Sequence, residues 1–75
     1  MPKLRPSPYN RPLFVRDNIN SIHTLAKNLH ITYGEIARET GIPHGAINRY
    51  ASGVALPDKD RYNLLAVFFD WEIWV

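Results

Sequence analysis

The sequence predicts an all-α domain of four to five short helices preceded by an extended arm rich in proline and arginine. Three observations indicate this fold class. Apolar residues recur at steps of three and four from Asp17 onward, which is the pattern of a buried helix face. Capping and stop signals divide this run into segments of about ten residues. The first twelve residues contain four of the six prolines, which exclude a helix there.

Length and composition limit the possible classes of protein. A chain of 75 residues, 45% of them hydrophobic and 21% charged, predicts one folded domain. The absence of cysteine excludes disulfides and thiolate metal sites. No apolar run approaches the roughly 18 residues that a membrane-spanning helix needs, and prolines interrupt the N-terminus where a signal peptide would be apolar. We therefore expect a cytoplasmic protein, without a cofactor, a metal or an evident small-molecule ligand.

Charge is distributed unevenly along the chain. Residues 1–16 contain four basic residues and no acidic one, whereas residues 17–75 contain five basic and seven acidic residues. The net charges are therefore +4 for a predicted arm, 1–16, and −2 for a predicted body, 17–75. Such an asymmetry is typical of an arm that binds a polyanion, and equally of a solvated tail that aids solubility.

The first helix is predicted over residues 18–29. Its buried face comprises Ile19, Ile22, Leu25, Ala26 and Leu29. Asp17 or Asn18 can cap its start, and His30 is expected to end it. The apolar residues 13–15 before it fit either a short strand or a hydrophobic anchor against the body.

Two local signals predict the start of a second helix, over 32–40. Thr32 followed by Glu35 is a capping box, in which each side chain accepts from the backbone N–H of the other residue. Ile31 and Ile36 form the matching hydrophobic staple. Gly41 can adopt the left-handed conformation that closes a helix.

A third helix, over 43–52, is expected to follow after only about three residues. Pro43 supplies the fixed φ of a first turn, and Gly53 ends the segment. Two short helices at such a separation form a helix-turn-helix. Helices of this length are unstable alone, so the first and fourth helices must hold them.

A fourth helix is predicted over 58–69. Asp58 caps it, and its buried stripe comprises Tyr62, Leu65, Ala66 and Phe69. The last six residues, 70–75, have an apolar pattern that fits either a short helix or a strand.

The spacing from Ile22 to Phe69 resembles the small phage-type repressor and Cro-like DNA-binding domains of the xenobiotic-response-element family. The matching positions are Tyr33, Ile36 and Ala37 in the second helix, Gly41 and Ile42 in the turn, Ile47 and Tyr50 in the third helix, then Gly53, Pro57, Leu64 and Leu65. The sequence departs from the pattern at Pro43, where a capping serine is common, and at Thr40, where an apolar residue is usual. The resemblance implies a sequence-specific regulator of transcription that binds double-stranded DNA.

The third helix is the expected recognition helix. If Ile47 and Tyr50 hold it to the body, its opposite face presents His44, Gly45, Asn48, Arg49 and Ser52. This face has no acidic and no large apolar residue, as a surface inserted into the major groove requires. Thr32, Tyr33 and Pro43, which lie at the starts of the two helices, complete the predicted DNA-binding set.

Individual roles follow from side-chain chemistry. Asn48 can bind an adenine edge with two hydrogen bonds, and Arg49 can bind either a guanine or a phosphate. His44 can donate to either of these as well. Tyr33 stands where the family often has a glutamine that reaches a phosphate, or it packs on the third helix. The N-terminus of the second helix is itself an expected phosphate site.

Gly45 is expected to lower helix propensity by roughly 1 kcal/mol relative to alanine. Either this cost is merely tolerated, or the glycine lets the helix backbone approach DNA closely.

The arm is expected to supply the positive charge that the body lacks. Nonspecific affinity for DNA comes mainly from neutralised phosphates, so Lys3, Arg5 and Arg11 are predicted to contact the DNA backbone or the minor groove.

The C-terminal segment predicts a homodimer. A chain of this size is not expected to bury all the large apolar side chains of this segment, which are Phe68, Phe69, Trp71, Ile73 and Trp74. The alternative function is a protein-interaction module, of antitoxin, antirepressor or adaptor type, that keeps the fold. No enzyme is predicted, because no phosphate-binding glycine loop or nucleophile–base pair is apparent.

Overall fold

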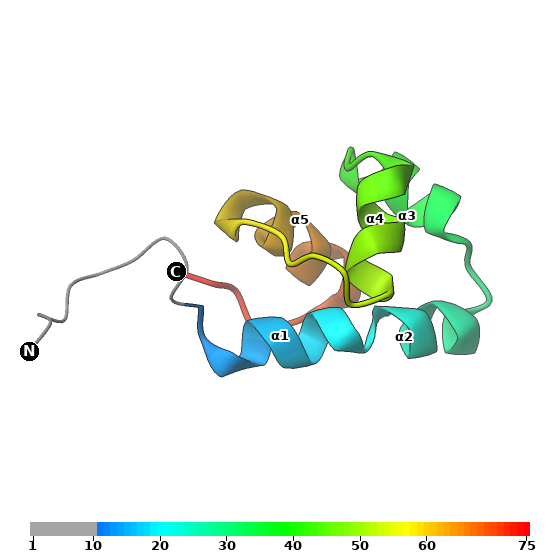
Figure 1. Ribbon diagram of the computed structural model, residues 1–75. Helices are drawn as coiled ribbons and strands as arrows, with labels where there is room; N and C mark the ends of the chain where they lie inside the picture. Colours follow the sequence, from blue (N-terminus) through cyan, green and yellow to red (C-terminus); the bar gives the residue numbers. More distant parts are fainter. Residues whose placement is uncertain (1–10) are drawn as a thin grey trace, which may run out of the picture.

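The computed structural model describes residues 11–75, and all regular elements in this part of the chain are α-helices, as predicted. They are α1 (Leu13–Asn20), α2 (Ile22–Leu29), α3 (Tyr33–Thr40), α4 (His44–Ala51) and α5 (Lys59–Phe69). In Figure 1, α1 and α2 run end to end along one edge, and α4 stands across them with α3 beside it. No described helix has the length and apolarity to cross a bilayer.

The domain starts earlier than expected. Residues 1–10 of the predicted arm lie outside the described residues, but Leu13–Arg16 form the first part of α1 rather than an extended chain or a strand. Pro12 precedes the helix with a ψ of 148°, and its carbonyl accepts from the N–H of Val15 at 3.0 Å. Val15 is fully buried and Phe14 packs against the core, whereas Leu13 is 81% exposed. Residues 14–15 therefore act as the anchor, and Leu13 does not.

The four-residue step from Val15 to Ile19 explains this early start. It extends the buried stripe of Ile19, Ile22 and Ala26 backward by one turn. Asp17 and Asn18 therefore both lie inside a helix, and neither caps one. At the other end, Leu29 was expected to be buried, but it is 56% exposed because it lies in the last turn before the chain leaves the helix.

The single helix predicted over 18–29 is interrupted at Ser21. The Ser21 hydroxyl donates to the carbonyl of Asn18 at 2.6 Å, and the Ser21 N–H bonds to the same oxygen at 3.0 Å. A serine that bonds locally to the backbone competes with the regular helical pattern, so α1 and α2 are separate helices on one line. His30 closes α2 with a φ of 58°, as expected.

The C-terminal segment is neither the helix nor the strand that was expected. Asp70 ends α5 in the left-handed conformation, and residues 71–75 have no regular secondary structure. They are held instead by α5 side chains. The Asn63 amide donates to the Trp74 carbonyl and accepts from the Trp74 N–H, both at 2.8 Å. These two bonds satisfy the backbone N–H and carbonyl of Trp74, which in a strand would bond to a neighbouring strand.

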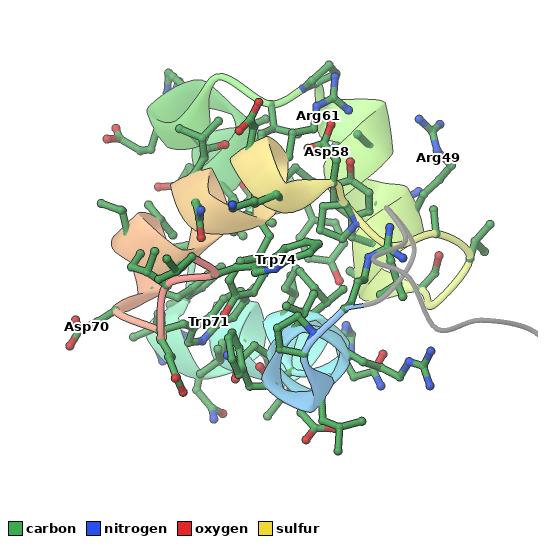
Figure 2. All side chains as sticks on the ribbon, turned by 90° about the vertical axis from the view of Figure 1, so that its left-hand side faces the viewer. Arg49, Asp58, Arg61, Asp70, Trp71 and Trp74 are labelled. Carbon is green, nitrogen blue, oxygen red and sulfur yellow. The ribbon has the colours of Figure 1, made fainter. Side chains whose placement is uncertain are left out.

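Tyr62 connects this segment to the helices. Its buried ring stacks on Trp71 with centroids 5.9 Å apart and meets Trp74 edge-on at 6.2 Å. Its hydroxyl donates to the carbonyl of Glu72 at 2.6 Å and accepts from the amide of Asn18 at 3.0 Å. Since Tyr62 also packs against Phe14, it joins α1, α5 and the C-terminal segment into one core. Figure 2 shows the two tryptophans of this segment, Trp71 and Trp74.

Candidate nucleic-acid interface

α4 is fixed to the domain along one side and exposed along the other. Ile47 is fully buried, and Ala46 and Tyr50 are nearly so. The five residues that were predicted to face outward are all exposed: His44, Gly45, Asn48, Arg49 and Ser52. Figure 2 shows Arg49 extending away from the body at one side of the molecule. One complete face of α4 is therefore open to a partner.

The turn before α4 is stabilised by a side chain as well as by glycine. Gly41 has the left-handed φ of 79°, and its N–H donates to the Ala37 carbonyl at 2.8 Å. The Thr40 hydroxyl donates to the carbonyl of Ile36 at 2.7 Å and accepts from the N–H of Ile42 at 3.3 Å. Thr40, polar where the resembled family is usually apolar, thus ties the end of α3 to the turn.

Pro43 was expected to be the first residue of the helix, but it is the N-cap residue, with φ −57° and ψ 141°. α4 therefore begins at His44, one residue later than expected, and ends at Ala51, one residue earlier than expected. The Pro43 carbonyl accepts from the N–H groups of Ala46 and Ile47 at 3.0 and 3.1 Å. Because proline has no polar side-chain atom, no side-chain cap forms, and Pro43 remains exposed at the start of the open face.

The predicted capping box of α3 is present. The Glu35 N–H donates to the Thr32 hydroxyl at 3.1 Å, and the Thr32 N–H donates to the Glu35 carboxylate at 3.0 Å. Thr32 is exposed, whereas Glu35 is half-buried. The box therefore uses two of the N–H groups that were expected to bind phosphate and brings a carboxylate to this helix end. Tyr33 and Gly34 retain their N–H groups for an anion.

Tyr33 contacts a residue that the sequence reasoning did not connect with it. Its hydroxyl lies 3.1 Å from Nδ1 of His23 on α2, and its ring is half-buried. Both residues line a hollow of about 480 Å³, which Lys27 and Thr32 also line. Lys27 adds a cation beside the start of α3. No spacing rule pairs residues of two different helices, so this contact could not be predicted from the sequence.

Tyr50 links α4 to α5 through a second unpredicted contact. Nη1 of Arg61 donates to the Tyr50 hydroxyl at 3.3 Å. This hydrogen bond, together with the nearby charge of Asp58, raises the pKa of the Arg61 guanidinium above its ordinary value. The Asp58 side chain also accepts from the N–H of Arg61 at 2.9 Å and caps α5 as predicted. α4 is thereby joined to the cap of α5 by polar as well as apolar contacts.

The three arm residues that were predicted to reach DNA divide into two groups. Lys3 and Arg5 lie outside the described residues. Arg11 is held by the body, because its Nε donates to the carbonyl of Pro57 at 3.3 Å. The predicted body, 17–75, has a net charge of −2, but Arg11 and Arg16 belong to the described domain, and residues 11–75 together contain seven basic and seven acidic residues.

The residues predicted to form a dimer interface are mostly used within the chain. Trp71 and Trp74 are half-buried against Tyr62, and the rings of Phe68 and Phe69 pack edge-to-face 4.9 Å apart. Phe69 also stacks on Trp71 at 4.8 Å. Of the five residues predicted for the dimer interface, only Ile73 is exposed, at 43%. The larger exposed apolar surface on α5 comes from Leu64 and Val67, at 47% and 75%, which the prediction did not include.

Comparison with known proteins adds no family. No protein-family model, no curated protein and no solved structure matches the chain.

Proposed function

We propose that this protein is a sequence-specific regulator of transcription that binds double-stranded DNA. In this proposal α3, the turn 41–43 and α4 act as a helix-turn-helix, and α4 enters the major groove. The exposed face of α4 carries the proposal. It combines an amide at Asn48 and a guanidinium at Arg49, the two side-chain types that bond bidentately to adenine and guanine edges.

The surroundings of this face agree with such a role. His44 and Gly45 lie in the first turn of α4, exposed beside Asn48, and the N-terminal part of a recognition helix is the part nearest the base edges. The rigid attachment of α4 through Ile47 and Tyr50 suits base readout, because contacts to bases require a fixed register. Lys27, in the last turn of α2 and beside the start of α3, provides a contact for a flanking phosphate.

Selection from a pool of random DNA duplexes tests the proposal. The full chain should enrich one sequence at both low and moderate salt, because base contacts persist where phosphate contacts weaken. On the selected duplex, Asn48→Ala and Arg49→Ala should each weaken binding by about 1–3 kcal/mol. Asn28→Ala makes the same chemical change at an exposed position of α2 and should leave affinity unchanged. Failure to enrich any sequence contradicts the proposal.

A protein-interaction module is the second candidate, and the exposed side chains of Leu64 and Val67 favour it. The two functions are distinguished by position. A DNA-binding protein loses its function through α4, whereas an adaptor loses it through the exposed side of α5. Trp71 and Trp74 are poor probes of this distinction because they form part of the protein's own core.

A further inference from the structure

A second basic feature lies between the start of the domain and the loop that joins α4 to α5. A hollow of about 530 Å³, open to solvent and with a mainly polar lining, lies here. Three of its residues come from the N-terminal side, namely Arg11, Arg16 and Asn20, and the other wall is the loop 53–56. Two guanidinium groups face this space, and none of the described lining residues is a carboxylate.

The fold holds each wall of this hollow in place. Arg16 and Asn20 are four residues apart on α1, which puts them on one side of the helix. Arg11 is fixed by its bond to the carbonyl of Pro57. In the loop, the N–H of Gly53 bonds to Tyr50 and that of Val54 to Arg49, at 3.2 and 3.0 Å. The loop is therefore closed onto the last turn of α4.

The hollow holds more positive charge than the fold itself uses. Arg11 uses one of its five N–H donors on Pro57, and within residues 11–75 no other acceptor engages it. Arg16 and Asn20 are exposed. Two guanidiniums and one amide thus offer several donors to a single acceptor group.

We propose that Arg11, Arg16 and Asn20 bind a phosphate group in this hollow. The planar fork of a guanidinium matches the oxygens of phosphate, and the side-chain amide adds a third donor. The phosphate comes either from a nucleic-acid backbone or from a free phosphate ester. The backbone source rests on the proposed function: Ser52, the last exposed residue of the α4 face, adjoins Gly53 in the wall of the hollow, so one duplex can occupy both.

Titration with inorganic phosphate at constant ionic strength tests the site without DNA. The amide signals of residues 53–56 and the Nε–H signals of Arg11 and Arg16 should shift saturably in the nuclear magnetic resonance spectrum. Arg16→Gln should weaken this binding severalfold, and Arg16→Lys should restore part of it. Arg16 is exposed, so these replacements leave the core intact. Lys59→Gln removes one charge at another exposed position and should have no effect.

Two results overturn the site. One is a response to phosphate that chloride reproduces at equal ionic strength. The other is an equal loss in Arg16→Gln and Lys59→Gln, which indicates diffuse charge instead of a site.

Binding to the selected duplex then identifies the source of the phosphate. If the backbone occupies the hollow, Arg16→Gln lowers the slope of log affinity against log salt by about 0.9, the value for one phosphate contact. If phosphate binds but this slope is unchanged, the site takes a free phosphate ester. Failure of the proposed function has a different signature, because Asn48→Ala and Arg49→Ala then change nothing while the phosphate titration still succeeds.

Discussion

At the scale of single residues, Gly45 offers the most direct separation of folding from binding. A Cβ at this position would meet only Nη1 of Arg49, at 3.7 Å, which is an ordinary contact. Gly34, in α3, has similar space, with Oγ1 of Thr32 at 3.7 Å. Neither glycine has the positive φ that Gly41 and Gly53 require. The fold therefore does not need a glycine at position 45.

Gly45→Ala should accordingly stabilise the protein and weaken DNA binding. Alanine in place of a helical glycine adds up to about 1 kcal/mol to the free energy of unfolding, whereas a methyl group on the open face would obstruct close approach of the helix backbone to DNA. Denaturant unfolding and duplex titration measure the two effects. Gly34→Ala provides the reference for stability. Unchanged affinity in Gly45→Ala would mean that the glycine serves no contact with DNA.

At the scale of the secondary-structure elements, the helix ends that could be predicted are those set by residues close together in the sequence. The α3 cap needs only Thr32 and Glu35, three residues apart, and it forms as predicted. The closing conformations of His30 and Gly41 are equally local. The start of α1 was missed because the nearby prolines dominated the composition, although Val15 stands one helical step before Ile19.

The remaining features depend on contacts between distant residues. Arg11 meets Pro57 across 46 positions, and Asn18 meets Tyr62 across 44. The apolar pattern of residues 70–75 fitted both a helix and a strand, and it did not indicate that Asn63 would hold the segment in neither form. The outward face of α4 was predictable from the helical period alone. The basic hollow beside it was not, because it forms only where α1 and the loop 53–56 are adjacent.

Asn63 should be necessary for the position of the C-terminal segment. Asn63→Ala removes two hydrogen bonds to Trp74, which should lower the free energy of unfolding by about 1–3 kcal/mol. Both tryptophans of the protein lie in this segment, so their fluorescence reports on it alone. The emission of the folded variant should shift to the red as the rings gain contact with water. Asn28→Ala is the matched control, and an emission maximum like that of the wild type would contradict the role assigned to Asn63.

At the scale of the whole molecule, the two exposed surfaces lie on different sides. In Figure 2, Arg49 and Asp70 stand at opposite edges of the domain. Val67 lies in the last turn of α5, and Asp70 is the residue that ends this helix. The end of α5 that carries Val67 is therefore at the edge away from Arg49. A second copy bound at Leu64 and Val67 leaves the α4 face free. This separation allows one surface to bind DNA while the other binds a partner subunit.

We expect a two-fold dimer through this side of α5, with Ile73 at its edge. Two recognition helices roughly 34 Å apart would then meet successive major grooves. Sedimentation of the wild type should reveal a dimer at micromolar concentration, and Val67→Asp should convert it to a monomer because a charge would be buried. Leu29→Asp places the same charge at an exposed position of α2 and should remain dimeric. A wild-type monomer at high micromolar concentration excludes this dimer in the absence of DNA.

Arg11 and Arg16 belong to the described domain, which changes what the predicted arm is expected to contribute. Deletion of residues 1–10 removes Lys3 and Arg5 but leaves Arg11 and Arg16, which belong to the body. If both lost residues contact phosphates, the slope of log affinity against log salt should fall by about 1.8, twice the value for one contact. We expect thermal unfolding to be unchanged, because the buried hydrophobic residues found within residues 11–75 lie between Val15 and Ala66. An unchanged slope would confine the nucleic-acid interface to residues 11–75, and a lower melting temperature would show that residues 1–10 also stabilise the domain.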